Sequence, residues 1–234
     1  MRDDEKAETT YKEIIRVQRR ELGAEHPHTL DTMSSLASFL IRADRMPAAE
    51  TMLQDVIVGR QQALGESHPD TIESMDSLRD VLSQQGKFID ATGQAEKIVE
   101  LQKKTLGEEH DETLGSMIIL AVTHAWRGEY LIPMALCQQV IKTIMNTSDG
   151  DDGILRLAVL HLVELLYLQG KFEEAELACR DVFLHIAKSR KNPDADVVQF
   201  KASLINDLHE AEIDELAAKF EREVDEVRSK ASGS

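Results

Sequence analysis

The chain has 234 residues, 42% of them hydrophobic and 30% charged, which is enough apolar material to bury a core and excludes a disordered chain. The formal net charge of −16 disfavours nucleic acid and anionic membranes as partners, because both require a basic surface, and it favours basic proteins or peptides. The sequence has no apolar run of the roughly 20 residues that a membrane span needs, and its N-terminus has no hydrophobic signal core, so we expect a cytoplasmic location.

From the N-terminus onward, one phrase occurs three times at intervals of 42 residues. Its copies are LGAEHPHTL at Leu22–Leu30, LGESHPDTI at Leu64–Ile72 and LGEEHDETL at Leu106–Leu114. The same interval separates a series of small residues: Ala7, Ala49, Ala91, Pro133, Ala175 and Ala217. A fixed period of this length indicates an array of stacked structural repeats.

Each period contains two apolar patterns with helical spacing, so we expect two helices per repeat. In chain order, we expect a half repeat at 5–22, full repeats at 28–64, 70–106, 112–147 and 153–190, and a degenerate or capping repeat at 194–229. Together they would form one array over 1–229, followed by a flexible tail at 230–234. The first helix of each pair is expected to end near Asp44, Gly86, Gly128 or Gly170, where a left-handed residue can stop a helix.

The repeated phrase joins the second helix of one pair to the first helix of the next. Glycine is placed to end a helix, proline is placed to start the next one, and a histidine precedes the helix start. These positions are Gly23, Gly65 and Gly107 for glycine, Pro27 and Pro69 for proline, and His26, His68 and His110 for histidine. Because a catalytic residue is needed once and not three times, we predict a capping or packing role for the histidines.

No sequence motif for catalysis, a cofactor or a metal ion is found. Phosphate-binding and nucleophile motifs are absent, and His161 with Glu164 provides one pair where a zinc site needs three or four ligands. The acidic stretch DGDDG at 149–153 lacks the ligand spacing of a calcium loop, so we interpret it as a solvated turn. Cys137 and Cys179 are expected to be free, buried thiols, because neighbouring helices usually lie too far apart for a disulfide.

The stretch GKFEEAE at Gly170–Glu176 resembles the turn and second-helix start of a tetratricopeptide repeat. The spacing from Ala37 to Ala49 matches the two small positions at which the helices of that family cross. A 42-residue form with LGxxHPxTL between units resembles the kinesin light chain type, and the resemblance covers essentially the whole chain. It implies an all-α fold, a right-handed α-solenoid of antiparallel helix pairs, that binds other proteins.

The sequence departs from the kinesin light chain pattern at one set of positions. That pattern has an asparagine pair in the first helix of each repeat, which helps to hold cargo peptides. The equivalent pairs in this chain are Ser34–Ser35, Asp76–Ser77, Ile118–Ile119 and Leu160–His161. Because no asparagine is present in these pairs, cargo binding of that particular type is not expected.

In the family that the chain resembles, the first helices of the pairs line a concave groove. The equivalent positions in this sequence predict a groove with an acidic second repeat and an apolar third and fourth repeat. The predicted groove residues are Ser34, Ser38, Arg42, Asp76, Asp80, Gln84, Ile118, Val122, Trp126, Glu164, Tyr167 and Leu168. We expect a peptide or helix with apolar anchors and basic flanks to bind there. Two alternatives remain: Ile118 and Val122 belong to the core, or the last helices or a second copy fill the apolar half.

The sequence therefore favours a non-catalytic interaction scaffold with no cofactor. One alternative is a sensor or regulatory segment of a receptor-like ATPase of the NB-ARC or NACHT type, which a nucleotide-binding domain upstream in the gene would support. Another is a homo-oligomeric structural module, which light scattering would detect.

Overall fold

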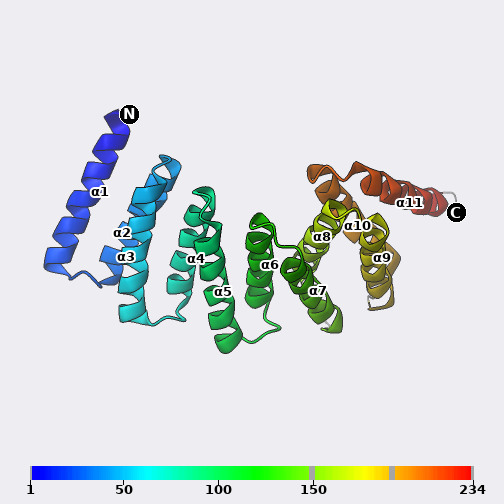
Figure 1. The fold of residues 1–234 in the computed structure, drawn as a ribbon, viewed down its shortest axis with the longest axis horizontal. Coiled ribbons are helices and arrows are strands. Elements are labelled where there is room, and N and C mark those ends of the chain that lie inside the picture. The colour runs from blue at the N-terminus through cyan, green and yellow to red at the C-terminus, as the bar shows by residue number, and fades with distance from the viewer. Residues whose placement is uncertain (1, 148–150, 190–192, 233–234) are drawn as a thin grey trace. The chain divides into compact units, whose positions relative to one another are not determined.

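The structure, a computed structural model, describes residues 2–147, 151–189 and 193–232, and within these ranges every regular element is an α-helix (Figure 1). In chain order the helices are α1 (Arg2–Glu21), α2 (Pro27–Arg42), α3 (Met46–Leu64), α4 (Pro69–Gln84), α5 (Phe88–Thr105), α6 (Asp111–Trp126), α7 (Leu131–Asn146), α8 (Asp152–Leu168), α9 (Phe172–Ser189), α10 (Pro193–Glu210) and α11 (Asp214–Ser232). The predicted all-α fold of antiparallel helix pairs is confirmed in this part of the chain. None of the described helices is both long and apolar enough to cross a membrane.

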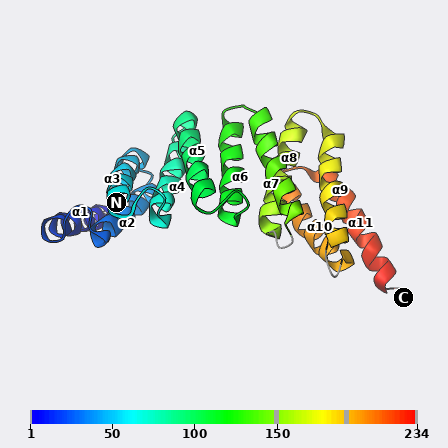
Figure 2. The same ribbon diagram turned by 90° about the horizontal axis from the view of Figure 1, so that it is seen from below.

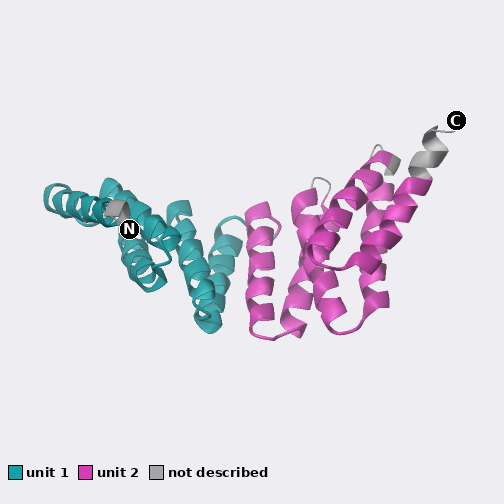
Figure 3. Ribbon diagram, turned by 90° about the horizontal axis from the view of Figure 1, so that it is seen from above, with its two compact units in different colours: residues 1–108 teal, residues 109–234 magenta. Residues whose placement is uncertain are grey.

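The chain forms two compact units, Met1–Glu108 and Glu109–Ser234 (Figure 3). In the first unit, the helices α1 to α4 each pack on the next helix in the chain. In the second unit, α6 to α11 pack in the same way, in the order that Figure 2 shows from below. In addition, α8 contacts α6 and α10. Helix pairs begin and end within three residues of the predicted repeat bounds. The single array over 1–229 stays a prediction. The predicted flexible tail covers 230–234. Helix α11 continues to Ser232, and residues 233–234 lie outside the described part of the chain.

Small residues allow the two helices of a pair to approach closely. Ala37 of α2 and Ala49 of α3 are both fully buried in one core cluster, together with the larger side chains of Met33 and Leu36. A larger side chain at either alanine would overpack this contact, at a cost of about 1–3 kcal/mol. Ala49, one member of the small-residue series of the sequence, therefore lies in the close contact between the two helices of its pair.

The turns within the pairs share one hydrogen-bonded geometry that needs a residue with positive φ. This residue is Asp44 (φ 55°), Gly86 (72°), Gly128 (76°), Gly170 (71°) and Glu212 (58°). In each turn, the next N–H donates back to the carbonyl five residues earlier, for example from Lys171 to Leu166 at 2.9 Å and from Ile213 to Leu208 at 2.8 Å. The four predicted helix ends are confirmed, and Glu212 adds a fifth turn in which the residue with positive φ is a glutamate.

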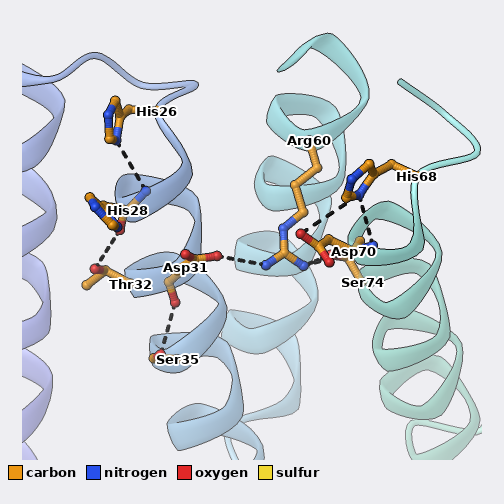
Figure 4. A network of polar contacts seen from close by, with 9 residues as sticks. All are labelled: His26, His28, Asp31, Thr32, Ser35, Arg60, His68, Asp70 and Ser74. Atoms are coloured by element: carbon orange, nitrogen blue, oxygen red, sulfur yellow. Dashed lines mark hydrogen bonds and ion pairs between the residues drawn. The ribbon is translucent and has the colours of Figure 1, made fainter. Parts of the chain in front are cut away.

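The histidines of the repeated phrase cap the helices that follow them. Nδ1 of His26 accepts a hydrogen bond from the N–H of His28 at 3.2 Å, and Nδ1 of His68 accepts one from the N–H of Asp70 at 3.2 Å (Figure 4). His110 caps α6 in the same way, through the N–H of Glu112. The predicted capping role is confirmed, because each ring satisfies an N–H that has no partner within its own helix.

A buried arginine links three helices of the first unit. The guanidinium of Arg60 in α3 donates to the carbonyl oxygen of Asp70 and to Oγ of Ser74, both at 2.8 Å and both in α4. It also pairs with Oδ1 of Asp31 in α2 at 3.1 Å (Figure 4). The Arg60 side chain is 9% exposed, whereas its partner Asp31 is 61% exposed, so the arginine lies largely out of water while its three contacts join α2, α3 and α4.

Candidate interaction site

A cavity of about 640 Å³ opens in the second unit between α6, α8 and the turn that joins α10 to α11. We call it the Trp126 pocket. Its lining residues are Ala121, Val122, Ala125 and Trp126 from α6, His161, Glu164, Leu165, Tyr167 and Leu168 from α8, and Ala211, Glu212 and Ile213 from the turn. Residues three and four apart lie on the same face of a helix, which explains why α6 and α8 each contribute such a set. The volume is in the range of pockets that bind small molecules or peptide side chains.

The rim of the Trp126 pocket presents large apolar side chains to solvent. Trp126 is 47% exposed and Leu168 is 72% exposed. Phe172, which is 56% exposed, makes an edge-to-face contact with Tyr167 at a centroid distance of 4.9 Å. Exposed apolar groups that gather around a cavity are typical of interaction surfaces, because covering them removes apolar area from water.

Acidic groups dominate the polar part of the pocket. Oε2 of Glu164 lies 2.7 Å from Nδ1 of His161, one turn away on α8. Burial raises the pKa of the Tyr167 hydroxyl, and the negative charges of Glu215 and Glu176 add to this shift. The pocket wall is therefore a negatively charged environment around an apolar floor.

Five predicted groove residues line the Trp126 pocket: Val122, Trp126, Glu164, Tyr167 and Leu168. A sixth, Ile118, is 4% exposed and belongs to the core of the second unit, which is the alternative that the sequence left open for it. Sequence reasoning missed the turn residues Ala211, Glu212 and Ile213. Their signal was the repeat period, since Glu212 lies 42 residues after Gly170. The last helices supply one wall of the pocket through this turn.

The predicted groove residues of the first unit lie in different surroundings. Ser34 and Ser38 line a polar cleft of about 230 Å³ between α2 and α4, whereas Arg42, Asp80 and Gln84 are exposed on their helices. This cleft also includes Asp31, Arg60 and three further serines.

The acidic pair predicted to bind basic flanks is partly neutralised within its own helix. Oδ1 of Asp76 and Oδ1 of Asp80 each lie 2.9 Å from guanidinium nitrogens of Arg79, whose side chain is 7% exposed. Burial raises the pKa of Asp80, with Arg79 acting in the opposite direction. Two carboxylates that share one arginine attract an external cation less than the sequence suggested.

The other candidate reactive groups of the described residues are two cysteines and the side chains that could bind a metal ion. Cys137 and Cys179 are free and buried, as predicted, and burial raises the pKa of both thiols to about 12, so neither is a nucleophile near neutral pH. Among the described residues, no group of three or more His, Cys, Asp or Glu side chains could hold a metal ion.

Comparison with known proteins agrees with the repeat architecture. Residues 29–70 and 71–112 each match the tetratricopeptide repeat family model, and each match spans one 42-residue period. No curated protein sequence matches the chain.

Solved structures with a similar fold include the following three. A Podosopora anserina protein, named for kinesin light chain and its nearly identical TPR-like repeats, is 23% identical, with a TM-score of 0.66 over 80% of this chain and 89% of that chain. BtubC (BKLC) from P. vanneervenii is 16% identical, with a TM-score of 0.61 over 99% and 93% of the two chains. The apo form of RapI is 13% identical, with a TM-score of 0.60 over 97% and 92%.

The fold and the family match together define a helical-repeat protein with tetratricopeptide repeats at residues 29–112. Over the rest of the chain, the likeness is one of fold, and it includes a structure named for kinesin light chain, the type that the 42-residue period resembles.

Proposed function

We propose that the chain is a non-catalytic interaction module whose second unit binds an apolar anchor of a protein or peptide partner in the Trp126 pocket. The observation that supports this proposal is a cavity of about 640 Å³ that Tyr167 lines and whose rim exposes Trp126 and Leu168. Tetratricopeptide repeats generally mediate protein–protein interaction, and an apolar pocket with aromatic walls supplies the buried contacts that dominate such interfaces.

The pocket can be tested with its own fluorophore, because Trp126 is the only tryptophan of the chain. Partners captured from a native extract are titrated into the purified chain, and binding is expected to shift the Trp126 emission. Leu168→Ser should weaken binding at least tenfold, since it removes a large apolar contact at the rim. Leu177→Ser is the matched control, because Leu177 is 58% exposed on α9 and does not line the pocket. Equal binding by both variants would contradict the proposed site.

The alternative is a module that binds a second copy of the same chain, and light scattering on the same purified protein tests it. Light scattering should give the mass of a monomer at micromolar concentration if the pocket serves a different protein. We also infer a cytoplasmic location, which the two free, buried cysteines favour and which cell fractionation would test.

A further inference from the structure

We infer that the partner segment in the Trp126 pocket places a lysine or arginine beside its apolar anchor, and that this cation pairs with Glu212. The inference rests on the proposed function and adds the chemistry of the partner. It moves the expected basic contact from Asp76 and Asp80, in the first unit, to the turn between α10 and α11.

The charges around the pocket are complementary to a cation. Among the described residues that line it, two are carboxylates, Glu164 and Glu212, and none is a lysine or arginine. Glu164 is engaged by His161. The structure gives no hydrogen bond or ion pair for the carboxylate of Glu212 within the described part of the chain. Glu212 therefore leaves an uncompensated negative charge at the edge of an apolar cavity.

The basic side chains of the neighbouring turns are not available to neutralise Glu212. Arg127, in the turn after α6, pairs with Glu129 at 2.9 Å. Lys171, in the turn after α8, lies 3.8 Å from a carboxylate oxygen of Glu174. A cation that pairs with Glu212 would consequently come from a bound partner.

The backbone conformation of Glu212 is a second observation that favours a function for its side chain. Its φ of 58° belongs to the left-handed region, where three of the other four equivalent turns have glycine. Asp44 is the remaining non-glycine residue, and aspartate tolerates this conformation because its short side chain can bond locally. Glutamate lacks that advantage, so Glu212 strains its own turn while placing a carboxylate at the pocket.

The same geometry disfavours an acidic partner. A carboxylate on the bound segment would face Glu212 and Glu164 beside a low-dielectric apolar surface, where like charges repel strongly. A lysine or arginine can pair with Glu212 and lay its apolar stem along the exposed ring of Trp126. The pocket therefore selects basic over neutral over acidic segments.

The test is a selection from a random decapeptide library displayed on phage, with the full chain as bait. The enriched peptides are then synthesised, and their Kd values are measured from the Trp126 emission. We expect an aromatic or aliphatic residue with a lysine or arginine within three positions of it. Replacing that basic residue by alanine should weaken binding to the native chain up to about fivefold, and should have no effect on binding to the Glu212→Gly variant.

The control uses the second strained turn of the chain. Glu212→Gly and Asp44→Gly both relieve a left-handed residue, so each should raise Tm, by up to about 2–4 °C. Only Glu212→Gly should weaken peptide binding, because Asp44 belongs to the first unit and does not line the pocket. If Glu212→Gly is more stable than the native chain but binds the peptide more weakly, Glu212 acts by contacting the ligand and not by maintaining the structure of the turn.

Three outcomes are distinguishable. If no peptide is enriched, or if the enriched peptides bind Leu168→Ser normally, the proposed function fails and the inference fails with it. If peptides bind at the pocket without a basic residue, the inference alone is wrong. If the basic residue contributes equally to binding of the native chain and of Glu212→Gly, Glu212 is not its partner, and the inference is again overturned.

Discussion

Gly59 lies in the interior of α3, where this helix packs against α2. A Cβ atom added at Gly59 would lie 2.5 Å from Cδ2 of Leu30, a side chain that is 2% exposed. Gly59→Ala therefore gains about 1 kcal/mol of helix propensity but loses about 1–3 kcal/mol to overpacking, a net loss of up to about 2 kcal/mol. Gly93→Ala in α5 is the matched control, because nothing lies within 4 Å of a Cβ atom there and only the gain applies.

Urea unfolding followed by circular dichroism measures both variants against the native chain. We expect the free energy of unfolding to rise by about 1 kcal/mol for Gly93→Ala and to be about 1–3 kcal/mol lower for Gly59→Ala than for Gly93→Ala. Equal stabilisation of the two variants would show that Leu30 has room to move, and would refute the close packing of α2 on α3 that this reasoning uses.

Two further predictions concern ionisable groups of the second unit. The thiols of Cys137 and Cys179 should not react with an aromatic disulfide reagent at pH 8 while the chain is folded, because burial raises the pKa of each to about 12. Both should react once the chain is unfolded in urea. Rapid labelling of the folded chain would contradict their burial. Hydrogen bonds from Lys219, and then from Arg180, lower the pKa of Glu176 in the folded state from its ordinary value of 4.5. The unfolded state then binds the proton more readily, so this stabilisation is present above pH 4.5 and is lost as the pH falls through the folded pKa. Because the side chains of Glu176 and Lys219 are both partly exposed, Lys219→Met should reduce the acid-induced loss of stability by at most about 0.5 kcal/mol, and a larger effect in thermal melts at pH 3 and 6 would contradict solvent screening.

The repeat period made the helices and turns predictable, because each of its positions has a fixed structural role. His26, His68 and Gly170 could be assigned from their recurrence in the sequence, without knowledge of distant contacts. The residues that break the recurrence were harder to place. Ile118 was expected in the groove, but a small rotation of α6 about its axis is enough to turn that side chain into the core, and the period does not determine this rotation.

The far wall of the Trp126 pocket could not be predicted for a different reason. Glu212 and Ile213 reach the pocket because α10 packs on α8, a contact between helices that are not neighbours in the chain. Helix periodicity predicts which face of a helix is apolar, but it does not predict which helices that are distant in sequence pack against that face. The neutralisation of Asp76 by Arg79, three residues later on the same helix, was present in the sequence and could have been inferred from spacing alone.

Arg60 has a consequence for how the first unit unfolds. In a stack of repeats, each repeat contacts only its neighbours, so the unit loses its structure either one repeat at a time or all at once, depending on the energy of each interface. The three bonds of Arg60 join α2 and α3 of one repeat to α4 of the next. Separating the two repeats would break the two bonds from Arg60 to α4, so this side chain adds to the energy of their interface and favours their opening as one cooperative body.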